Sequence, residues 1–329
     1  MNLFILLAFI LLIFSISRKS AFLLFSFAIL FVISAYREYT VGTDTLNYLL
    51  HFEQVFVSPN SRFEAAWNWL NSTIFGMGGT FTDLLIISTL LCLIPVFWVS
   101  FKDSKNANFS LFLYFSLYFY SYSLNILRQM IAVSFVLLAF YMIKQHKKLF
   151  ALGIILFASQ FHLSALIALP MLFLDKFKLS DQAYFVLLFF AFVVGLFMIQ
   201  QLISFAQIIP YAHYLRTGEL GNMSGNLVYL MIFNMFFLFL YMVVKEKSFY
   251  FHLFFVFVIL ENLFVRIPFS ERIVLFNSIA QILFFPEVVT NNKLQQRWVV
   301  WLVVVLYSFF IFFRQLGNGG IFPYENVLF

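Results

Sequence analysis

The feature that most constrains this chain is a series of long apolar runs that almost no charge interrupts. Hydrophobic residues make up 63% of the 329 positions and charged residues only 10%. Soluble domains carry about 25% charged residues, so this chain has too few charges to cover a soluble surface. The runs are continuous and do not alternate with a period of two, which argues against the strands of a membrane barrel. The sequence therefore predicts an all-α polytopic integral membrane protein that lies in the lipid bilayer.

Ten apolar segments have the composition of membrane-spanning helices, and flanking Tyr and Trp extend the shorter ones to the interface. No linker, repeat or low-complexity tract divides the chain, so we expect a single membrane domain over 1–329. The first run follows no basic region and precedes no evident cleavage site, which favours an uncleaved first helix. The segments are 2–17, 20–36, 81–100, 109–124, 129–143, 183–203, 227–244, 249–265, 273–289 and 298–313.

Two topologies fit the remaining apolar segment, 149–174. It is either one long crossing or two half-helices that meet near Gln160–His162 and leave on the side where they entered. Cytoplasmic loops carry the excess of Lys and Arg. The re-entrant topology places 13 cations inside and 7 outside, against 11 and 9 for the single crossing. We therefore expect about ten transmembrane helices plus a re-entrant helix pair, with both termini outside.

This topology leaves two long outward loops, 37–80 and 204–226, and sorts the cations by type. Every lysine is inside, whereas the outward cations are all arginine. Arginine binds phosphate through a planar fork of donors and stays protonated, so an outward face with only arginine indicates an anionic ligand. The alternative is that some of them pair with Glu38, Glu64, Glu219 or Glu271. The outward arginines are Arg37, Arg62, Arg128, Arg216, Arg266, Arg272 and Arg314.

The first outward loop begins with a polar cluster and is expected to contain two interfacial helices, from about Leu46 and from about Arg62. In the cluster, Gly42 allows a tight turn, and Thr43 or Asp44 can cap the helix that follows. A functional role is the other interpretation, because an arginine and a carboxylate converge where the chain leaves the membrane. The chemistry-bearing residues are Arg37, Thr43, Asp44, Thr45 and Tyr48.

Asn125, Arg128 and Gln129 form the second cluster, between two spans that almost no loop separates. Arg128 is therefore expected near the hydrocarbon boundary, where an ionisable group usually faces a cavity or a partner. The alternative is an arginine that extends to the membrane surface.

His162 belongs to the third cluster, at the tip of the re-entrant pair and at membrane depth. Broken helices at that depth line protein or a water-filled cavity, so His162 is either a satisfied structural residue or a proton acceptor. Arg266, Glu271 and Arg272 form the fourth cluster, at another outward boundary.

Several signatures are missing from the sequence. It contains no P-loop, dinucleotide fingerprint, HExxH motif or serine elbow, and no carboxylate cluster suits a divalent metal. The single cysteine, Cys92, lies in an apolar run and is expected to pack in the core. We expect no cofactor, no metal and no nucleic-acid partner. A group donor outside the membrane must arrive activated, most simply on a lipid pyrophosphate.

Four motifs in order resemble the EpsG-type polysaccharide polymerases, which are Wzy-like proteins of bacterial surface-glycan pathways. They are R-x4-G-T-D-T-x2-Y-x3-F at 37–52, N-x2-R-Q-x2-A at 125–132, F-H-x-S-A-L at 161–166, and an arginine region at Arg272 with Phe276 and Pro286 downstream.

The resemblance implies a metal-independent glycosyltransferase with a helical fold like that of lipid-linked glycosyltransferases. It would transfer a growing glycan from undecaprenyl pyrophosphate to another lipid-linked repeat, in O-antigen, capsule or exopolysaccharide synthesis. Its substrates would be undecaprenyl-pyrophosphate-linked oligosaccharides, and its partners a chain-length regulator and a flippase of the same pathway. The protein would lie in the bacterial cytoplasmic (inner) membrane, with its active site on the periplasmic or outer face.

Within this interpretation we expect His162 to be the general base and Asp44 to position the acceptor sugar or the loop. Asp44 is the second candidate for the base, although nearby Arg37 would lower its pKa. Substrate and pyrophosphate would be bound by Arg37, Arg128, Gln129, Arg216, Arg266 and Arg272. Supporting residues would be Thr43, Thr45, Tyr48, Asn125 and Glu271.

Two other functions fit the composition. A flippase for the same lipid-linked sugar should place cations along a path in both halves of the membrane, whereas the cations expected at depth here are all outward. A membrane acyltransferase that modifies the glycan would need an acyl-donor site reachable from the cytoplasm, and the sequence offers no candidate for one.

Overall fold

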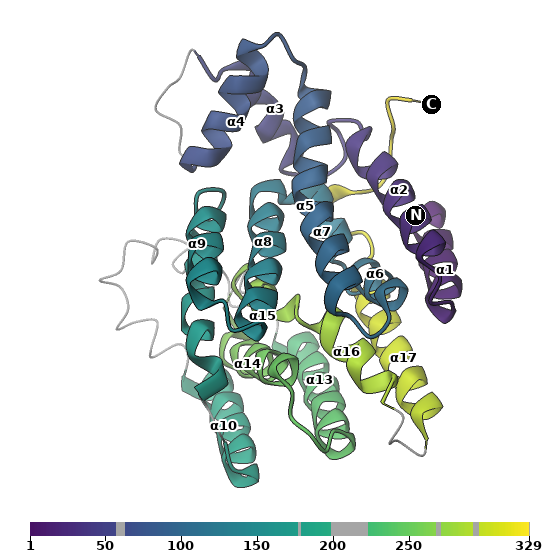
Figure 1. The fold of residues 1–329 in the computed structure, drawn as a ribbon, viewed down its shortest axis with the longest axis vertical. Helices are drawn as coiled ribbons and strands as arrows, with labels where there is room; N and C mark the ends of the chain where they lie inside the picture. The colour runs from purple at the N-terminus through teal and green to yellow at the C-terminus, as the bar shows by residue number, and fades with distance from the viewer. Residues whose placement is uncertain (57–62, 177–178, 199–222, 268–270, 292–295, 329) are drawn as a thin grey trace. The chain divides into compact units, whose positions relative to one another are not determined.

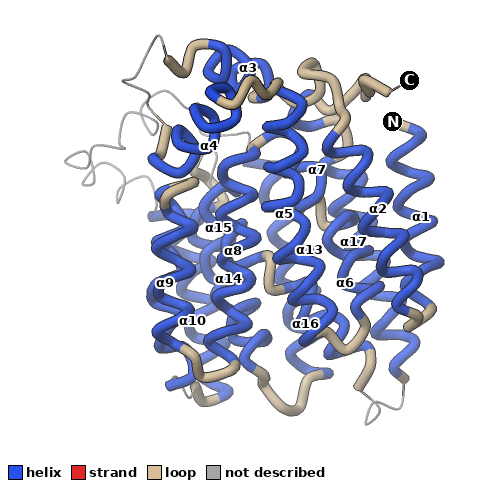
Figure 2. Tube along the Cα trace, turned by 45° about the horizontal axis from the view of Figure 1, so that its top comes forward, coloured by secondary structure: helices blue, strands red, loops and turns tan. Residues whose placement is uncertain are grey.

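The computed structural model describes residues 1–56, 63–176, 179–198, 223–267, 271–291 and 296–328. Within these ranges every regular element is a helix and no strand occurs (Figure 2). Four helical stretches are long and apolar enough to cross a membrane, and several more apolar helices are shorter. The expectation of an all-α membrane protein is confirmed, whereas the number of crossings stays a prediction. The four are α5 (Phe81–Asp103), α8 (Leu127–Lys144), Arg272–Val289 and α17 (Arg297–Gln315).

The helix contacts divide the chain into two compact units, and the single membrane domain expected from the sequence stays a prediction. Unit 1 comprises 1–172 and 279–329, and unit 2 comprises 173–278. The apolar segments of both units have the same kind of composition. Nothing in the sequence therefore marks where one set of helix contacts ends and the next begins.

A short central helix, α6 (Ala107–Ser116), organises unit 1. All its residues from Asn108 to Ser116 are buried. The helix carries the polar residues Asn108, Ser110 and Ser116. Polar side chains of membrane helices usually face other helices and not lipid, which fits this central position. The helices packed against it are α1 (Asn2–Ile16), α2 (Ser20–Ala35), α5, α16 (Gln281–Val289) and α17 (Figure 1).

One expected span, 109–124, is two helices, so the prediction of a single helix there is wrong. After α6 the chain turns at Tyr118, whose backbone is left-handed with φ of 72°, and α7 (Phe119–Asn125) follows. A left-handed non-glycine residue costs about 1–2 kcal/mol, and no periodicity reveals it. The Tyr118 hydroxyl donates to the carbonyl of Asn318 at 3.1 Å, which ties this turn to the C-terminal part of the chain. The expected span 273–289 is confirmed as an apolar helical stretch, Arg272–Val289, in which a turn at 279–280 separates α15 (Glu271–Ser278) from α16.

The segment 37–80 contains two helices, α3 (Thr45–Glu53) and α4 (Ala65–Gly76), which lie at one end of α5 (Figure 1, Figure 2). Their position outside the cell and at the membrane interface stays a prediction. Trp67 is buried beside Tyr48, with ring centroids 5.2 Å apart, whereas Trp69 is 67% exposed. The two tryptophans of α4 therefore face opposite environments, as expected for a helix at an interface.

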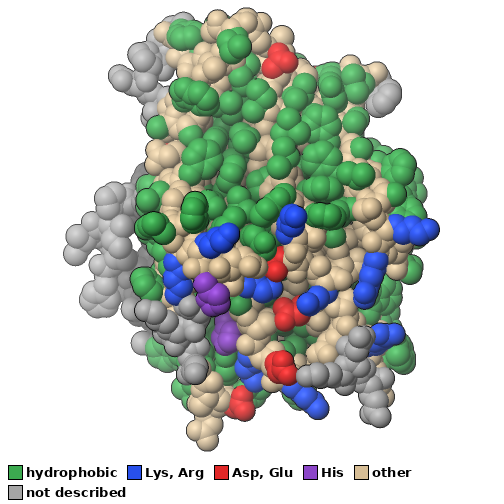
Figure 3. All heavy atoms as spheres, in the orientation of Figure 1, with side chains coloured by type: hydrophobic (Ala, Val, Ile, Leu, Met, Phe, Trp, Pro, Cys, Tyr) green, Lys and Arg blue, Asp and Glu red, His purple; other side chains and the backbone are tan. Residues whose placement is uncertain are grey.

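The described lysines of unit 1 gather at one end of its helices, opposite Arg37 and Arg128. The amide of Asn108 donates to the carbonyls of Ser17 and Lys19, which places the α1–α2 turn beside the start of α6. At the same end, Lys144 at the end of α8 pairs with Asp103 at the end of α5, at 2.8 Å. Figure 3 shows charged side chains gathered over part of one face while hydrophobic side chains cover another part. The described lysines of unit 1 therefore lie at the end opposite Arg37 and Arg128, and the side of the membrane that each end faces stays a prediction.

Between α8 and the end of unit 1, the helix α9 (Lys148–Ser159) packs along α8 and stops at a turn over Gln160–His162. A 3₁₀ helix, η1 (Leu163–Lys176), follows. The break expected near Gln160–His162 is therefore present. Whether the segment returns to the side where it entered stays a prediction.

Unit 2 is held together by polar contacts between apolar helices. It contains α10 (Asp181–Val193), the π-turn η2 (Val194–Met198), α13 (Met223–Val243), α14 (Phe249–Phe264) and α15. The side-chain amides of Asn234 and Asn262 donate to each other, both at 2.8 Å. Gly195 in η2 lies against the backbone of Asn262, where any side chain would collide. Close approach at a small residue and paired amides are typical of helices packed in a membrane.

Candidate functional site

The first motif loop (37–45) is held by residues from the far end of the chain. The backbone N–H groups of Gly42 and Thr43 donate to the carbonyls of Gly320 and Gly319, both at 2.9 Å. Residues 317–327, here called the return segment, follow α17. Gly42 has a φ of +95°, and a Cβ atom there would lie 2.6 Å from the carbonyl oxygen of Leu124. Only glycine satisfies this backbone conformation and this close approach together.

Asn125, at the end of α7, connects the second motif to this loop. Its Oδ1 accepts the backbone N–H of Asp44 at 2.9 Å and the hydroxyl of Thr43 at 3.1 Å. The Thr45 hydroxyl donates to the carbonyl of Val41 at 2.7 Å. Asp44 precedes α3 without a side-chain capping hydrogen bond, so the predicted cap is not made by its carboxylate. Asp44 is half-buried and Thr43 is exposed, which leaves both within reach of a ligand.

Arg37 is only 1% exposed, so a phosphate group of a substrate cannot reach it in this structure. Its Nη1 donates to the carbonyl of Ser34 at 2.6 Å, while Nε and Nη2 have no hydrogen-bond partner. The return segment covers it, with Asn326 paired to Arg37 in a backbone bridge. Burial lowers the pKa of Arg37 to about 10, which still leaves the guanidinium charged at neutral pH. In this arrangement Arg37 supports the loop from beneath.

Arg128 and the turn at His162 meet at one carboxylate. Glu64 forms an ion pair with Arg128, and its other oxygen accepts the backbone N–H of Leu163 at 3.2 Å. The guanidinium carbon of Arg128 lies 4.2 Å from the centroid of the Phe63 ring. The pairing of an outward arginine with Glu64, which the sequence left as an alternative to phosphate binding, is therefore present. The ion pair with Glu64 occupies Nη1 of the Arg128 guanidinium, which has five N–H donors in all.

The other predicted residues fall into three groups. Gln129, Thr45 and Tyr48 are buried inside unit 1 and can act on a ligand only through their neighbours. Arg266 and Arg272 belong to unit 2, where Nη1 of Arg266 donates to the carbonyl of Leu196 and Arg272 is exposed. Arg216 and most of the second outward loop lie outside the described residues, as does the side chain of Glu271.

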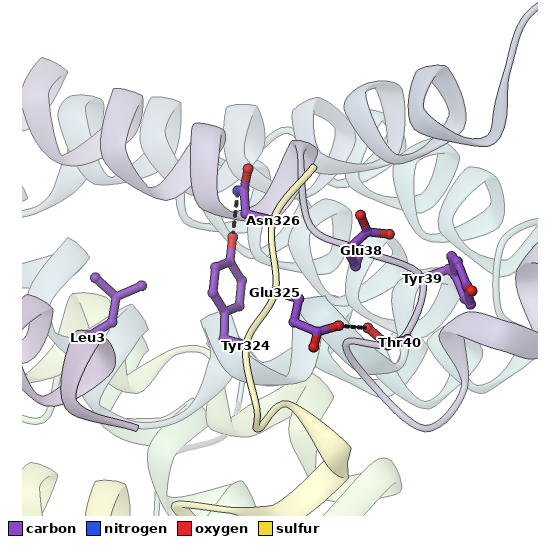
Figure 4. Close-up of a pocket in the computed structure, with 7 residues that line it drawn as sticks. All are labelled: Leu3, Glu38, Tyr39, Thr40, Tyr324, Glu325 and Asn326. Carbon is purple, nitrogen blue, oxygen red and sulfur yellow. Dashed lines mark hydrogen bonds between the residues drawn. The ribbon is translucent and has the colours of Figure 1, made fainter. Parts of the chain in front are cut away.

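An open pocket of about 860 Å³ lies beside the first motif loop (Figure 4). The Thr40 hydroxyl donates to the carboxylate of Glu325 at 2.9 Å, and the amide of Asn326 donates to the hydroxyl of Tyr324 at 3.0 Å. Carboxylates accept hydrogen bonds and repel anions, so this lining suits the hydroxyl groups of a neutral glycan better than a phosphate. Its residues are Leu3, Glu38, Tyr39, Thr40, Tyr324, Glu325 and Asn326.

No residue of the return segment was expected in the site from the sequence. The only signal was the Gly319–Gly320 pair, which permits a close backbone approach. A Cβ atom at Gly320 would lie 2.8 Å from the Thr43 side chain, and one at Gly319 would lie 3.0 Å from the Asn125 amide. Glycine is therefore required at both positions, because the return segment packs closely against the first and second motif segments there.

The fold and the site define a multi-pass helical membrane protein with a polar site at the end of unit 1 opposite its lysines. The model of the EpsG family matches residues 20–326. The chain belongs to the EpsG family, which confirms the resemblance drawn from the motifs. No match was found among curated proteins or among solved structures. Family membership supports a role in polysaccharide polymerisation.

Proposed function

We propose that this protein is a metal-independent glycosyltransferase that polymerises oligosaccharide repeats linked to undecaprenyl pyrophosphate. The observation that carries the proposal is the convergence of three motif segments at one end of unit 1. Asn125 joins the second motif to the first, and Glu64 joins Arg128 to the turn at His162. Residues far apart in the sequence are seldom brought to one accessible polar end of a helix bundle unless they serve a site.

The proposed reaction transfers the growing glycan from one lipid-linked chain to the next repeat. A hydroxyl oxygen of the acceptor sugar attacks the anomeric carbon of the donor while the bond from that carbon to the pyrophosphate oxygen breaks. The electron pair leaves with the lipid pyrophosphate, and the imidazole of His162 takes the hydroxyl proton. Arg128 stabilises the charge that develops on the leaving oxygens. Arg272 is assigned the same role from its sequence motif alone.

In this proposal, the two ends of the substrate are bound by regions of the protein with opposite charge. The guanidinium of Arg128 suits the anionic pyrophosphate, whereas the pocket lined by Glu38 and Glu325 suits hydroxyl groups. Glu38 lies in the same loop as Asp44, so a glycan that enters the pocket would pass over the first motif loop. Asp44 is then placed to position the acceptor sugar.

The topology is part of the proposal. About ten crossings and a re-entrant pair would place every lysine in the cytoplasm and the site on the outer face of the cytoplasmic membrane. Cysteines introduced at Ser58 and Gly221 should react with an impermeant reagent in intact cells, and one introduced at Lys176 should not. Labelling at position 176 from outside would contradict the re-entrant pair.

The decisive test uses purified protein with defined lipid-linked repeat units. A ladder of products that differ by one repeat supports the polymerase. Movement of the same substrate across a vesicle membrane without chain extension would indicate a flippase instead. Incorporation of an acyl group would indicate an acyltransferase.

A further inference from the structure

Glu64 lies outside every motif, yet it contacts two motif segments at once. Its Oε2 pairs with Nη1 of Arg128, and its Oε1 accepts the backbone N–H of Leu163 at 3.2 Å. Leu163 directly follows His162. A single carboxylate therefore sets the relation between the arginine assigned to the pyrophosphate and the turn that carries the proposed base.

The residues around Glu64 fix its position in three further ways. The Phe63 ring lies under the guanidinium of Arg128 at 4.2 Å. The backbone N–H of Ala66 donates to the carbonyl of Gln160 at 2.9 Å, and the Asn68 amide donates to the carbonyl of Phe63 at 2.7 Å. The start of α4 is thus attached to α8 and to the end of α9 together.

The position of Glu64 at its own helix suggests a role beyond the stability of α4. It precedes the first residue of α4, where the shorter side chains of Ser, Thr, Asp and Asn usually cap the free N–H groups of the helix. The Glu64 side chain makes no such capping hydrogen bond. It extends to Arg128 and Leu163 instead, so its contacts serve the neighbouring segments.

Arg128 keeps unused binding capacity in this arrangement. Glu64 engages Nη1, and Nε is buried without a hydrogen-bond partner, so the other Nη nitrogen carries the donors left for a ligand. The side chains of Arg128 and Glu64 are 17% and 23% exposed, so the pair is open to a ligand from one side. A guanidinium held by a carboxylate at one edge can present its other donors to a phosphate in a fixed orientation.

We propose that Glu64 is a positioning residue that orients Arg128 and the His162 turn for the glycosyl transfer. This inference rests on the proposed function. Glu64 has two opposing effects on an anionic donor. Its negative charge weakens binding of the pyrophosphate, and its geometry aligns the groups that act in the transition state.

The test is Glu64→Gln, which keeps the size of the side chain and an oxygen acceptor for Leu163 but removes the charge. The matched control is Glu53→Gln, an exposed carboxylate of α3 in the same outward loop. In the polymerisation assay we expect Glu64→Gln to lower kcat by about 10- to 100-fold, because Arg128 is no longer held in one orientation. We expect the KM for the lipid-linked donor to fall, because a repelling charge is gone. The control should change neither constant.

A purely structural role would give a different pattern. Loss of folded protein would lower the amount of active enzyme without lowering KM, and the melting temperature of the purified variant would fall in parallel. An unchanged kcat in a folded Glu64→Gln protein, or a raised KM, would overturn the inference.

A second measurement does not depend on turnover. Inorganic pyrophosphate should raise the melting temperature of Glu64→Gln at a concentration about 2- to 10-fold lower than it needs for the wild-type protein, the effect of removing one partly exposed charge. Equal or weaker binding by the variant overturns the role of Glu64. The wild-type protein could give no product ladder while the difference in pyrophosphate binding is still observed. That result would refute the proposed reaction, but not the proposal that Glu64 orients Arg128.

Discussion

The side-chain oxygen of Asn125 lies 2.9 Å from the backbone nitrogen of Asp44, which joins the second motif to the first. The same oxygen accepts the hydroxyl of Thr43 at 3.1 Å. Asn125 is 8% exposed, so water cannot easily replace it. The candidate site therefore depends on one amide that both motif segments share.

Asn125→Ala should leave the N–H of Asp44 without a partner and cost about 1–3 kcal/mol of stability. We expect the first motif loop to loosen and polymer synthesis to fall. Asn125→Asp keeps the acceptor oxygen and should retain more activity than the alanine variant. Limited proteolysis near the loop, together with polymer length in cells, measures both effects. Equal behaviour of the two variants would show that the acceptor oxygen is unimportant.

Gly42→Ala tests the close approach of the first motif loop to α7. Its φ of +95° is unfavourable for alanine, and the added Cβ would lie 2.6 Å from the carbonyl oxygen of Leu124. Gly78 is a matched control, because its φ is +78° and nothing lies within 4 Å of an added Cβ. Conformation alone should cost about 1–2 kcal/mol in both variants. Only Gly42→Ala should show a further fall in melting temperature and a loss of activity.

Arg128→Lys keeps the positive charge but loses the planar fork that binds phosphate. We expect a strong loss of turnover, and the same from Arg272→Lys if both side chains contact the donor pyrophosphate. Arg314→Lys, at an exposed position at the end of α17, is the control and should retain activity. Full activity of both test variants would mean that Arg128 and Arg272 serve orientation or structure only.

His162→Ala should lower the transfer rate by about 10²–10⁴-fold, the usual effect of losing a general base. Protein level and the amount of lipid-linked repeats in cells should stay normal. Asp44→Asn should mainly raise the KM for the acceptor, because Asp44 is assigned to positioning. Normal polymer in His162→Ala together with its loss in Asp44→Asn would exchange the two roles.

His51 gives the outward helices a pH dependence. Burial lowers its pKa below 6.5, and nearby Arg128 lowers it further, while a hydrogen bond to Asn68 opposes the shift. Since the packed form resists protonation, the contribution of His51 to stability is complete above pH 6.5 and decreases as the pH falls towards its lowered pKa. Hydrogen-exchange protection of α3 and α4, corrected for the intrinsic pH dependence of exchange, should therefore decrease as the pH falls below about 6.5. In His51→Gln this decrease should disappear, and its persistence would assign it to another group.

The apolar runs predicted the helices well. In a lipid bilayer the backbone N–H and C=O groups must bond to each other, and a helix satisfies them within one segment. The run 2–17 is α1 (Asn2–Ile16), and the run 298–313 lies within α17. The turn at Tyr118 was not predictable in this way. Tyr and Ser flank it as they flank many helical positions, and its left-handed conformation depends on contacts with the return segment.

The motif residues of the candidate site could be chosen from the sequence, but their surroundings could not. An arginine at a membrane boundary suggests a ligand equally well for Arg37 and for Arg128. The structure buries Arg37 under the return segment and leaves Arg128 partly open beside Glu64. This difference arises from pairing between distant segments, which local periodicity does not encode.

The return segment has a consequence for the biogenesis of the protein. The ribosome makes the first motif loop early, but Gly319 and Gly320, which accept its N–H groups, are made only after α17. A chain that is still being inserted therefore carries the motif residues without their final backbone geometry. The first motif loop can therefore take the backbone geometry seen here only after the return segment has been made.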